Sequence, residues 1–222
     1  MTVKKSQEQQ LFKEINRAWL PPPDLTISEW EDSERKIPPE ASAEPGQWRT
    51  SRAEYQREIM NAISNPFTER VVVMTAAQVG KTEILLNTIG YFIDKEPGPI
   101  LCLNPTLEMG EAFSKDRLAP MIRDTPVLQN KIKDPRSRDS GNTLRHKKFV
   151  GGHITIAGAN SPASLASRPI RILLCDEVDR YPMSAGTEGD PLTLAMKRLL
   201  IQVHVKNGVY LARLAANISL LH

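Results

Sequence analysis

The sequence of 222 residues lacks the features that mark membrane proteins, secreted proteins and proteins with cysteine-based metal sites. No apolar run approaches the roughly 20 residues of a membrane-spanning helix, and the lysines near the N-terminus have no apolar stretch behind them. Only two cysteines occur, Cys102 and Cys175, without C-x-x-C spacing or neighbouring histidines. We therefore expect no membrane span, no secretory signal, no metal site built on cysteine, and two buried reduced thiols in a cytosolic protein.

The composition is otherwise that of an ordinary globular chain without internal repeats or low-complexity tracts. Hydrophobic residues make up 40% of the chain, enough for the core of one sizeable domain, and charged residues make up 25%. The net charge of +3 permits a nucleic-acid partner without indicating one.

The first 48 residues differ in pattern from the rest. Residues 1–20 carry apolar side chains at helical spacing, which predicts a helix. Residues 21–48 contain six of the 17 prolines, so we expect little regular structure there. An extended arm lying on a domain or partner and a flexible linker are both open interpretations.

From residue 52 onward, predicted helices alternate with short apolar strands. We expect helices over 52–64, with Ser51 as the N-cap and Glu54 completing a capping box, over 81–94, and over 107–124 with a break near Pro120. We expect buried strands over 70–75, 99–103, 153–158 and 170–175. This alternation predicts an α/β fold with a mostly parallel sheet flanked by helices.

The stretch MTAAQVGKTE, residues 74–83, is close to the phosphate-binding pattern G-x-x-x-x-G-K-[ST], but Thr75 stands at the first glycine. A predicted strand precedes it and a predicted helix follows, as a phosphate site at a helix N-terminus requires. Gly80 would allow close backbone approach, Lys81 would reach the β- and γ-phosphates, and Thr82 would offer its hydroxyl to Mg²⁺. The alternative is a chance G-K-T at an ordinary helix start.

The stretch IRILLCDEVDRYP, residues 170–182, is an apolar strand that ends in two carboxylates. Beside a phosphate-binding loop, Asp176 would hold Mg²⁺ and Glu177 would act as general base on the attacking water. The alternative is a pair of solvated acids at a strand end.

Two further segments suggest contacts with a base and with nucleic acid. Tyr55 or Trp48 could stack on an adenine, and Gln56 could hydrogen-bond its edge, unless Tyr55 packs in the core and Gln56 is solvated. Residues 131–148, which we interpret as a loop, hold seven lysines and arginines against two aspartates. That segment could grip a phosphate backbone or be a solvated surface loop.

Together these stretches resemble the ATPase domain of the large terminase subunit of tailed bacteriophages, in the lambda-like group. The resemblance covers about residues 48–198 and includes MTAAQVGKTE, GGHITIAGANSPASLASRPIRILLCDEVDRYP and GTEGDPLTLAMKR. It implies a RecA-like P-loop NTPase that binds ATP and Mg²⁺ and pumps double-stranded viral DNA into a procapsid. It also implies a small terminase subunit, a portal and further copies of the chain as partners, in the cytoplasm of a bacterial host.

The resemblance assigns Lys81 and Thr82 to the phosphates and Mg²⁺, Asp176 to Mg²⁺, and Glu177 to catalysis. It places Ser164, Ser167 and Arg168 near the nucleotide or a neighbouring subunit.

The sequence departs from the family in its arginine finger and at its end. Ala77 and Gln78 occupy the places where many members carry the finger, which must then come from Arg168, Arg117 or a neighbouring subunit. Residues 199–222 keep no S-T-P-like motif and suggest a frameshift in a prophage gene, with the last sheet strand missing or replaced.

We therefore expect a helix and arm over 1–47, the ATPase domain over 48–198, an atypical tail over 199–222, and no nuclease domain. Two alternatives are a truncated prophage remnant that binds ATP or a partner without turnover and a fragment of a helicase or restriction-type DNA translocase.

Overall fold

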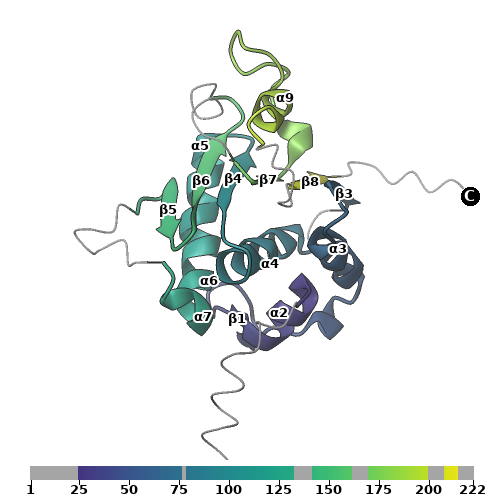
Figure 1. The fold of residues 1–222 in the computed structure, drawn as a ribbon, viewed down its shortest axis with the longest axis vertical. Helices are drawn as coiled ribbons and strands as arrows, with labels where there is room; N and C mark the ends of the chain where they lie inside the picture. The colour runs from purple at the N-terminus through teal and green to yellow at the C-terminus, as the bar shows by residue number, and fades with distance from the viewer. Residues whose placement is uncertain (1–24, 77–78, 133–141, 162–169, 200–207, 215–222) are drawn as a thin grey trace, which may run out of the picture.

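The computed structural model describes residues 25–76, 79–132, 142–161, 170–199 and 208–214, the last range by its backbone alone. Its centre is a six-stranded sheet with the strand order β3-β8-β7-β4-β6-β5 (Figure 1). The strands are β3 (Arg70–Thr75), β4 (Pro99–Asn104), β5 (His146–Phe149), β6 (Gly152–Gly158), β7 (Ile172–Cys175) and β8 (Gly208–Leu214). Every neighbouring pair is parallel except β5 with β6, so the predicted α/β fold with a mostly parallel sheet is confirmed.

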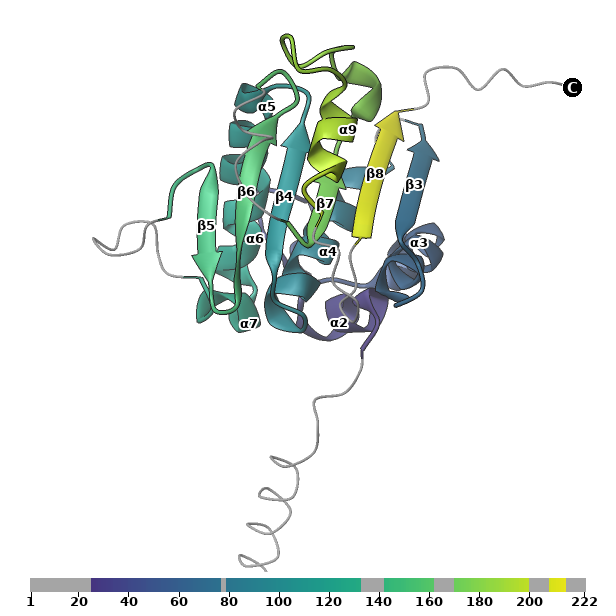
Figure 2. The same cartoon turned by 45° about the horizontal axis from the view of Figure 1, so that its top comes forward.

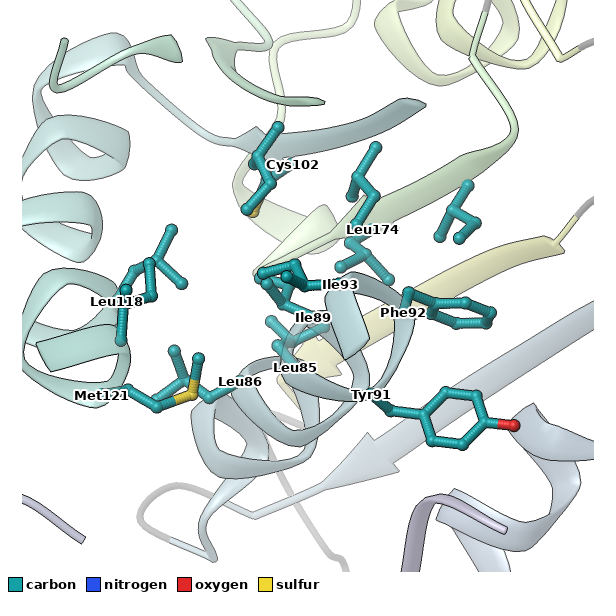
Figure 3. Close-up of a cluster of buried hydrophobic side chains, with 14 of the residues drawn as sticks. Leu85, Leu86, Ile89, Tyr91, Phe92, Ile93, Cys102, Leu118, Met121 and Leu174 are labelled. Atoms are coloured by element: carbon teal, nitrogen blue, oxygen red, sulfur yellow. The ribbon is translucent and has the colours of Figure 1, made fainter. Parts of the chain in front are cut away.

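Alternate residues along the strands enter two separate cores, as the pleat of a strand requires. In β4, Ile100 and Cys102 belong to the larger core, whereas Leu101 and Leu103 belong to the smaller one. The larger core is filled by helix α4 (Lys81–Asp94), which buries every residue from Ile84 to Ile93, and Figure 3 shows its side chains against Cys102, Leu174, Leu118 and Met121. Cys102 and Cys175 are buried free thiols, as predicted.

The smaller core lies under the chain that follows β7. A 3₁₀ turn (Val178–Arg180) and helix α9 (Pro191–Met196) cover it. On the other face of the sheet, the helix predicted over 107–124 runs as α5 (Leu107–Phe113), a π-helical turn (Ser114–Leu118) and α6 (Ala119–Asp124), followed by α7 (Pro126–Gln129). Pro120 stands in the first turn of α6, where its missing N–H needs no partner. None of the described helices has the length and apolarity to span a membrane.

The expectation of little regular structure over 21–48 is wrong for the residues that the structure describes. Helix α2 (Ile27–Glu34) begins with a capping box of Thr26 and Glu29, and β1 (Lys36–Ile37) pairs with β2 (Gly46–Gln47). The prolines flank these elements rather than interrupt them. Trp30 of α2 is fully buried and donates to Asp94 of α4 at 2.9 Å, so this segment is part of the domain. Residues 1–20 lie outside the described residues.

The predicted start of the next helix also needs correction. Residues Thr50–Arg52 form a 3₁₀ turn, and helix α3 spans Tyr55–Ser64 with Glu54 at its N-cap. Ser51 is therefore inside the turn and caps nothing. The backbone N–H of Thr50 donates to Asp32 at 2.6 Å, and this contact from α2 holds the chain in the turn.

The basic segment 131–148 is not a loop throughout. Its last three residues belong to β5, the edge strand that pairs antiparallel with β6. Lys147 is buried in this strand and donates to the Thr143 carbonyl at 3.3 Å. Residues 133–141 lie outside the described residues, so a DNA contact by that part stays a prediction.

The tail supplies a strand of the main sheet. Strand β8 pairs in parallel with β3 along Arg70–Thr75 and with β7 along Ile172–Cys175 (Figure 2). Of the two expectations for the last sheet strand, missing or replaced, a missing strand is wrong, because β8 lies between β3 and β7. Whether the tail is read out of frame stays a prediction.

Candidate active site

The two sequence motifs meet at one edge of the sheet. Strands β3 and β7 are both parallel to β8, which lies between them, so their carboxyl ends lie at the same edge (Figure 2). The loop after β3 leads into α4, and Asp176 and Glu177 follow β7 directly. Ligands of open α/β sheets bind at this edge, outside the carboxyl ends of the strands.

Gly80 and Lys81 form the end of the loop and the start of α4. Gly80 is the N-cap of the helix with a φ of 75°, in the left-handed region that favours glycine. The Lys81 Nζ is buried and has no hydrogen-bond partner within the described part of the chain, and the same holds for the Thr75 hydroxyl. A buried ammonium without a partner is strongly disfavoured unless an anion compensates it. Thr82 follows in the first turn of α4 and is half-buried.

Asp176 interacts electrostatically with this lysine. Burial raises the pKa of Asp176, Glu177 and Asp179 raise it further, and the positive charge of Lys81 opposes the rise. The Asp176 amide donates to the Leu103 carbonyl at 3.0 Å, which ties the strand end to β4. A crowded, partly buried carboxylate of this kind gains from a bound cation.

Glu177 has an unusual backbone conformation. Among the described residues it is the one non-glycine residue with a positive φ, at 48°. Such strain persists where surrounding contacts enforce it and is concentrated at functional sites. The Glu177 carboxylate accepts from the Arg180 guanidinium at 3.0 Å, and the Tyr181 hydroxyl donates to the Leu103 carbonyl at 2.8 Å. The loop after β7 is thereby fixed at both ends.

Tyr55 and Gln56 both contact the backbone of the loop before Lys81. The Tyr55 hydroxyl donates to the Val79 carbonyl at 2.9 Å, and the Gln56 amide donates to the Val79 carbonyl at 3.2 Å and to that of Gly80 at 3.5 Å. Tyr55 is 58% exposed and Gln56 is 2% exposed, so a core tyrosine and a solvated glutamine are both excluded. Trp48 is buried under Arg35, 4.8 Å from its guanidinium carbon, so it offers no face to a base.

Comparison with known proteins shows the family of the chain. The family model of the ATPase domain of the phage terminase large subunit gpA matches residues 42–203. The chain belongs to this family. The terminase large subunit of Enterobacteria phage P21 is 29% identical over 179 residues, and that of Escherichia phage lambda is 29% identical over 184 residues. These matches cover 80% and 82% of the chain but 28% of each relative, so the chain spans under a third of their length.

A solved structure supports the same fold. The large terminase of bacteriophage HK97 superposes with a TM-score of 0.63 over 86% of the chain and 38% of that protein, at 12% identity. At this identity the likeness shows the fold of a terminase ATPase domain and no more.

Several residues expected in a terminase site lie outside the described residues. Ala77, Gln78, Ser164, Ser167 and Arg168 all fall there. Arg117 lies in the π-helical turn and is exposed. The source of an arginine finger therefore stays a prediction.

Sequence reasoning missed two arginines that contact the site. Arg180 pairs with Glu177, and buried Arg35 pairs with Glu83 and with the Asn87 side chain, both in α4. Arg180 lies in the stretch IRILLCDEVDRYP, three residues after Glu177, so the sequence alone could have suggested this pair. Arg35 could be found only after recognising α2 from the capping box of Thr26 and Glu29.

Proposed function

We propose that this terminase ATPase domain hydrolyses ATP and couples hydrolysis to translocation of double-stranded DNA during viral genome packaging. One observation carries the proposal. The buried Lys81 ammonium, which has no hydrogen-bond partner among the described residues, stands at a helix N-terminus within electrostatic range of the Asp176 carboxyl, whose pKa is raised. Family membership and the shared sheet edge support the same conclusion.

The residues fit a nucleotide with its metal ion. The N-terminus of α4 and the Lys81 ammonium would bind the phosphates, with Gly80 allowing close backbone approach. The Thr82 hydroxyl and the Asp176 carboxylate would hold Mg²⁺, which neutralises charge on the β- and γ-phosphates when bound. Asp176 suits this role because its burial leaves a carboxylate in need of a cation.

Glu177 is proposed as the general base. Its carboxylate would take a proton from the attacking water, whose oxygen forms the new bond to the γ-phosphorus as the bond to the β-phosphate oxygen breaks. ADP and inorganic phosphate are the products. The Arg180 guanidinium donates to Oε2 of this carboxylate, which has further lone pairs that can accept the proton.

The remaining roles follow from the family alone. DNA, a small terminase subunit, a portal and further copies of the chain are proposed partners in the cytoplasm of a bacterial host. An arginine from Arg117, Arg168 or a neighbouring copy would complete the site. Tyr55 and Gln56 are close enough to the loop to influence nucleotide binding, and a direct contact with adenine stays a prediction.

The test is nucleotide binding and Mg²⁺-dependent ATP hydrolysis by the purified chain, with and without double-stranded DNA. Lys81→Ala should abolish nucleotide binding, and Glu177→Gln should keep binding but lower turnover by about 10²- to 10⁴-fold. Lys95→Ala, at the other end of α4, and Glu188→Gln, an exposed residue, are the matched controls. Binding without turnover in the unaltered chain would favour the remnant that holds ATP, and absence of binding would contradict the proposal.

A further inference from the structure

The loop that precedes Lys81 is held from outside by the first turn of α3. Two side chains at consecutive positions, Tyr55 and Gln56, converge on one carbonyl, that of Val79, at 2.9 and 3.2 Å. The Gln56 amide also reaches the Gly80 carbonyl at 3.5 Å. We call these two side chains the loop clamp.

The geometry of the peptide bond gives the clamp a consequence for anion binding. All described peptide bonds are trans, and in a planar trans peptide the C=O and N–H vectors point in opposite directions. Donors on α3 that draw the Val79 carbonyl toward themselves therefore turn the Gly80 N–H away from α3. In a phosphate-binding loop, the N–H groups before the lysine are the ones that face the anion.

Packing shows that the clamp and the glycine fit together closely. A Cβ atom added at Gly80 would lie 2.5 Å from the Gln56 Nε2, closer than two such atoms can approach. The left-handed φ of Gly80 and the nearness of Gln56 thus both require glycine here. The loop has Thr75 in place of its first glycine, so its shape depends more on such outside contacts.

The clamp stands on a well-anchored helix. In α3, Ser64 accepts from the Ile27 amide at 2.7 Å, and Asn61 accepts from Ser28 at 2.6 Å, which ties the helix to α2. Met60 of α3 contacts Asn87 of α4. The two donors are therefore held at a fixed position relative to the helix that carries Lys81.

We propose that Tyr55 and Gln56 are positioning residues that orient the amides of the phosphate-binding loop. They thereby strengthen binding of the phosphates of any nucleotide and do not select adenine. The inference rests on the proposed function, because it needs a phosphate-bearing ligand at the loop. The Gln56 Nε2 donates to loop carbonyls, and its Oε1 has no partner among the described residues. The residue is 2% exposed, so the amide is enclosed against the loop rather than open to a base edge.

Calorimetric titration with ADP, GDP and pyrophosphate separates the two roles. Tyr55→Phe and Gln56→Met remove the donors while keeping the shape of the side chains. We expect each to weaken all three ligands by the same factor, about 2- to 10-fold, which is the range for one hydrogen bond. The preference for ADP over GDP should stay unchanged. Loss of the preference for ADP over GDP, with pyrophosphate binding unchanged, would overturn the inference and indicate that the two side chains recognise the base.

Amide hydrogen exchange tests the clamp without any ligand. Both variants should speed exchange at the Gly80 and Lys81 amides, while exchange in the second half of α4 stays unchanged. Tyr91→Phe and Gln47→Met, which lose hydrogen bonds to Glu96 and to the Asp32 carbonyl, are matched controls and should leave the loop amides unaffected. Unchanged exchange at Gly80 and Lys81 in both clamp variants would overturn the inference.

The two proposals fail in different ways. If the unaltered chain binds none of the three ligands, the proposed function fails and the clamp fails with it as a device for phosphate binding. If the chain binds them through Lys81 but the clamp variants behave as their controls, only the clamp is overturned.

Discussion

The two sides of the candidate site are supported by different parts of the chain. The phosphate side, Gly80 to Thr82, is held by residues 23 to 48 positions earlier, among them Gln56 to Val79 and Arg35 to Glu83. The carboxylate side, Asp176 and Glu177, is tied to β4 through the Leu103 carbonyl, and the ion pair of Glu177 is local, with Arg180 three residues away. The Arg35 and Gln56 side chains are buried, whereas Arg180 of the local pair is exposed. The two sides should therefore respond very differently to loss of one partner.

Arg35 is where this difference should be largest. Its guanidinium is buried and contacts the carboxylate and carbonyl of Glu83 and the side chain of Asn87. Arg35→Met leaves the partly buried Glu83 carboxylate without its cation, and breaking a buried pair in this way costs about 3–5 kcal/mol. Urea unfolding followed by tryptophan fluorescence would measure the loss in free energy of unfolding.

A surface ion pair provides the control for Arg35. Arg52 pairs with Glu44, and their side chains are 54% and 68% exposed. Arg52→Met should change the free energy of unfolding by less than about 1 kcal/mol. The double variant Arg35→Met with Glu83→Met should recover much of the loss, since no unpaired charge remains. Equal losses for Arg35→Met and Arg52→Met would remove the contrast between buried and exposed support.

Substitution of Gly80 tests the close contact between the phosphate-binding loop and Gln56 of α3. Gly80→Ala forces a left-handed φ on alanine, which costs about 1–2 kcal/mol, and pushes its Cβ into Gln56. We expect Gly80→Ala to lower the free energy of unfolding by this amount and to weaken pyrophosphate binding, which calorimetry would measure. Gly189→Ala is the control because Gly189 has a φ of 100° but nothing within 4 Å of an added Cβ. If the two variants lose the same stability and bind pyrophosphate equally well, the contact with Gln56 has no effect.

Glu31 gives the distant support a pH dependence. Burial raises its pKa to about 8, and the hydrogen bond from Thr50 and the charge of Arg35 oppose the rise. The unfolded carboxyl ionises near 4.5, so between about pH 4.5 and 8 the folded state binds the extra proton and loses stability as the pH rises. The contribution is on the order of 1.4 kcal/mol per pH unit. Glu31→Gln should remove it, seen as a smaller change in unfolding free energy between pH 6 and 7 than in the unaltered chain. An equal change in both proteins would contradict the raised pKa.

The difference between local and distant support also explains what the sequence could predict. The bounds of β3 and α4 agree with the predicted ranges 70–75 and 81–94, because a β-branched run and a helical apolar pattern flank one loop. Asp176 and Glu177 were identified for the same reason, as acids directly after an apolar strand. These features are set by residues adjacent in the chain.

Features that depend on tertiary contacts were not accessible in this way. Helix α2 lies among prolines, and its stability comes from burying Trp30 against Gly90 of α4. The turn at Thr50 displaces the expected helix start because Asp32 holds it. The place of β8 between β3 and β7 depends on pairing with two strands far away in the sequence. Each needs a partner that no local pattern reveals.

Substitution of Arg180 should have the smallest effect on stability, and it tests the carboxylate side of the site directly. The pair with Glu177 joins residues on one short turn, with side chains 55% and 25% exposed, so it contributes at most about 1 kcal/mol. Because this contact occupies one oxygen of the proposed base, Arg180→Ala should raise ATP turnover about 2- to 5-fold without DNA, and Arg180→Lys should raise it less. Arg123→Ala, at an arginine side chain 54% exposed, should leave turnover unchanged. A fall in turnover for Arg180→Ala would show the opposite role, a guanidinium that stabilises the transition state, and the carboxylate side would then carry its own arginine.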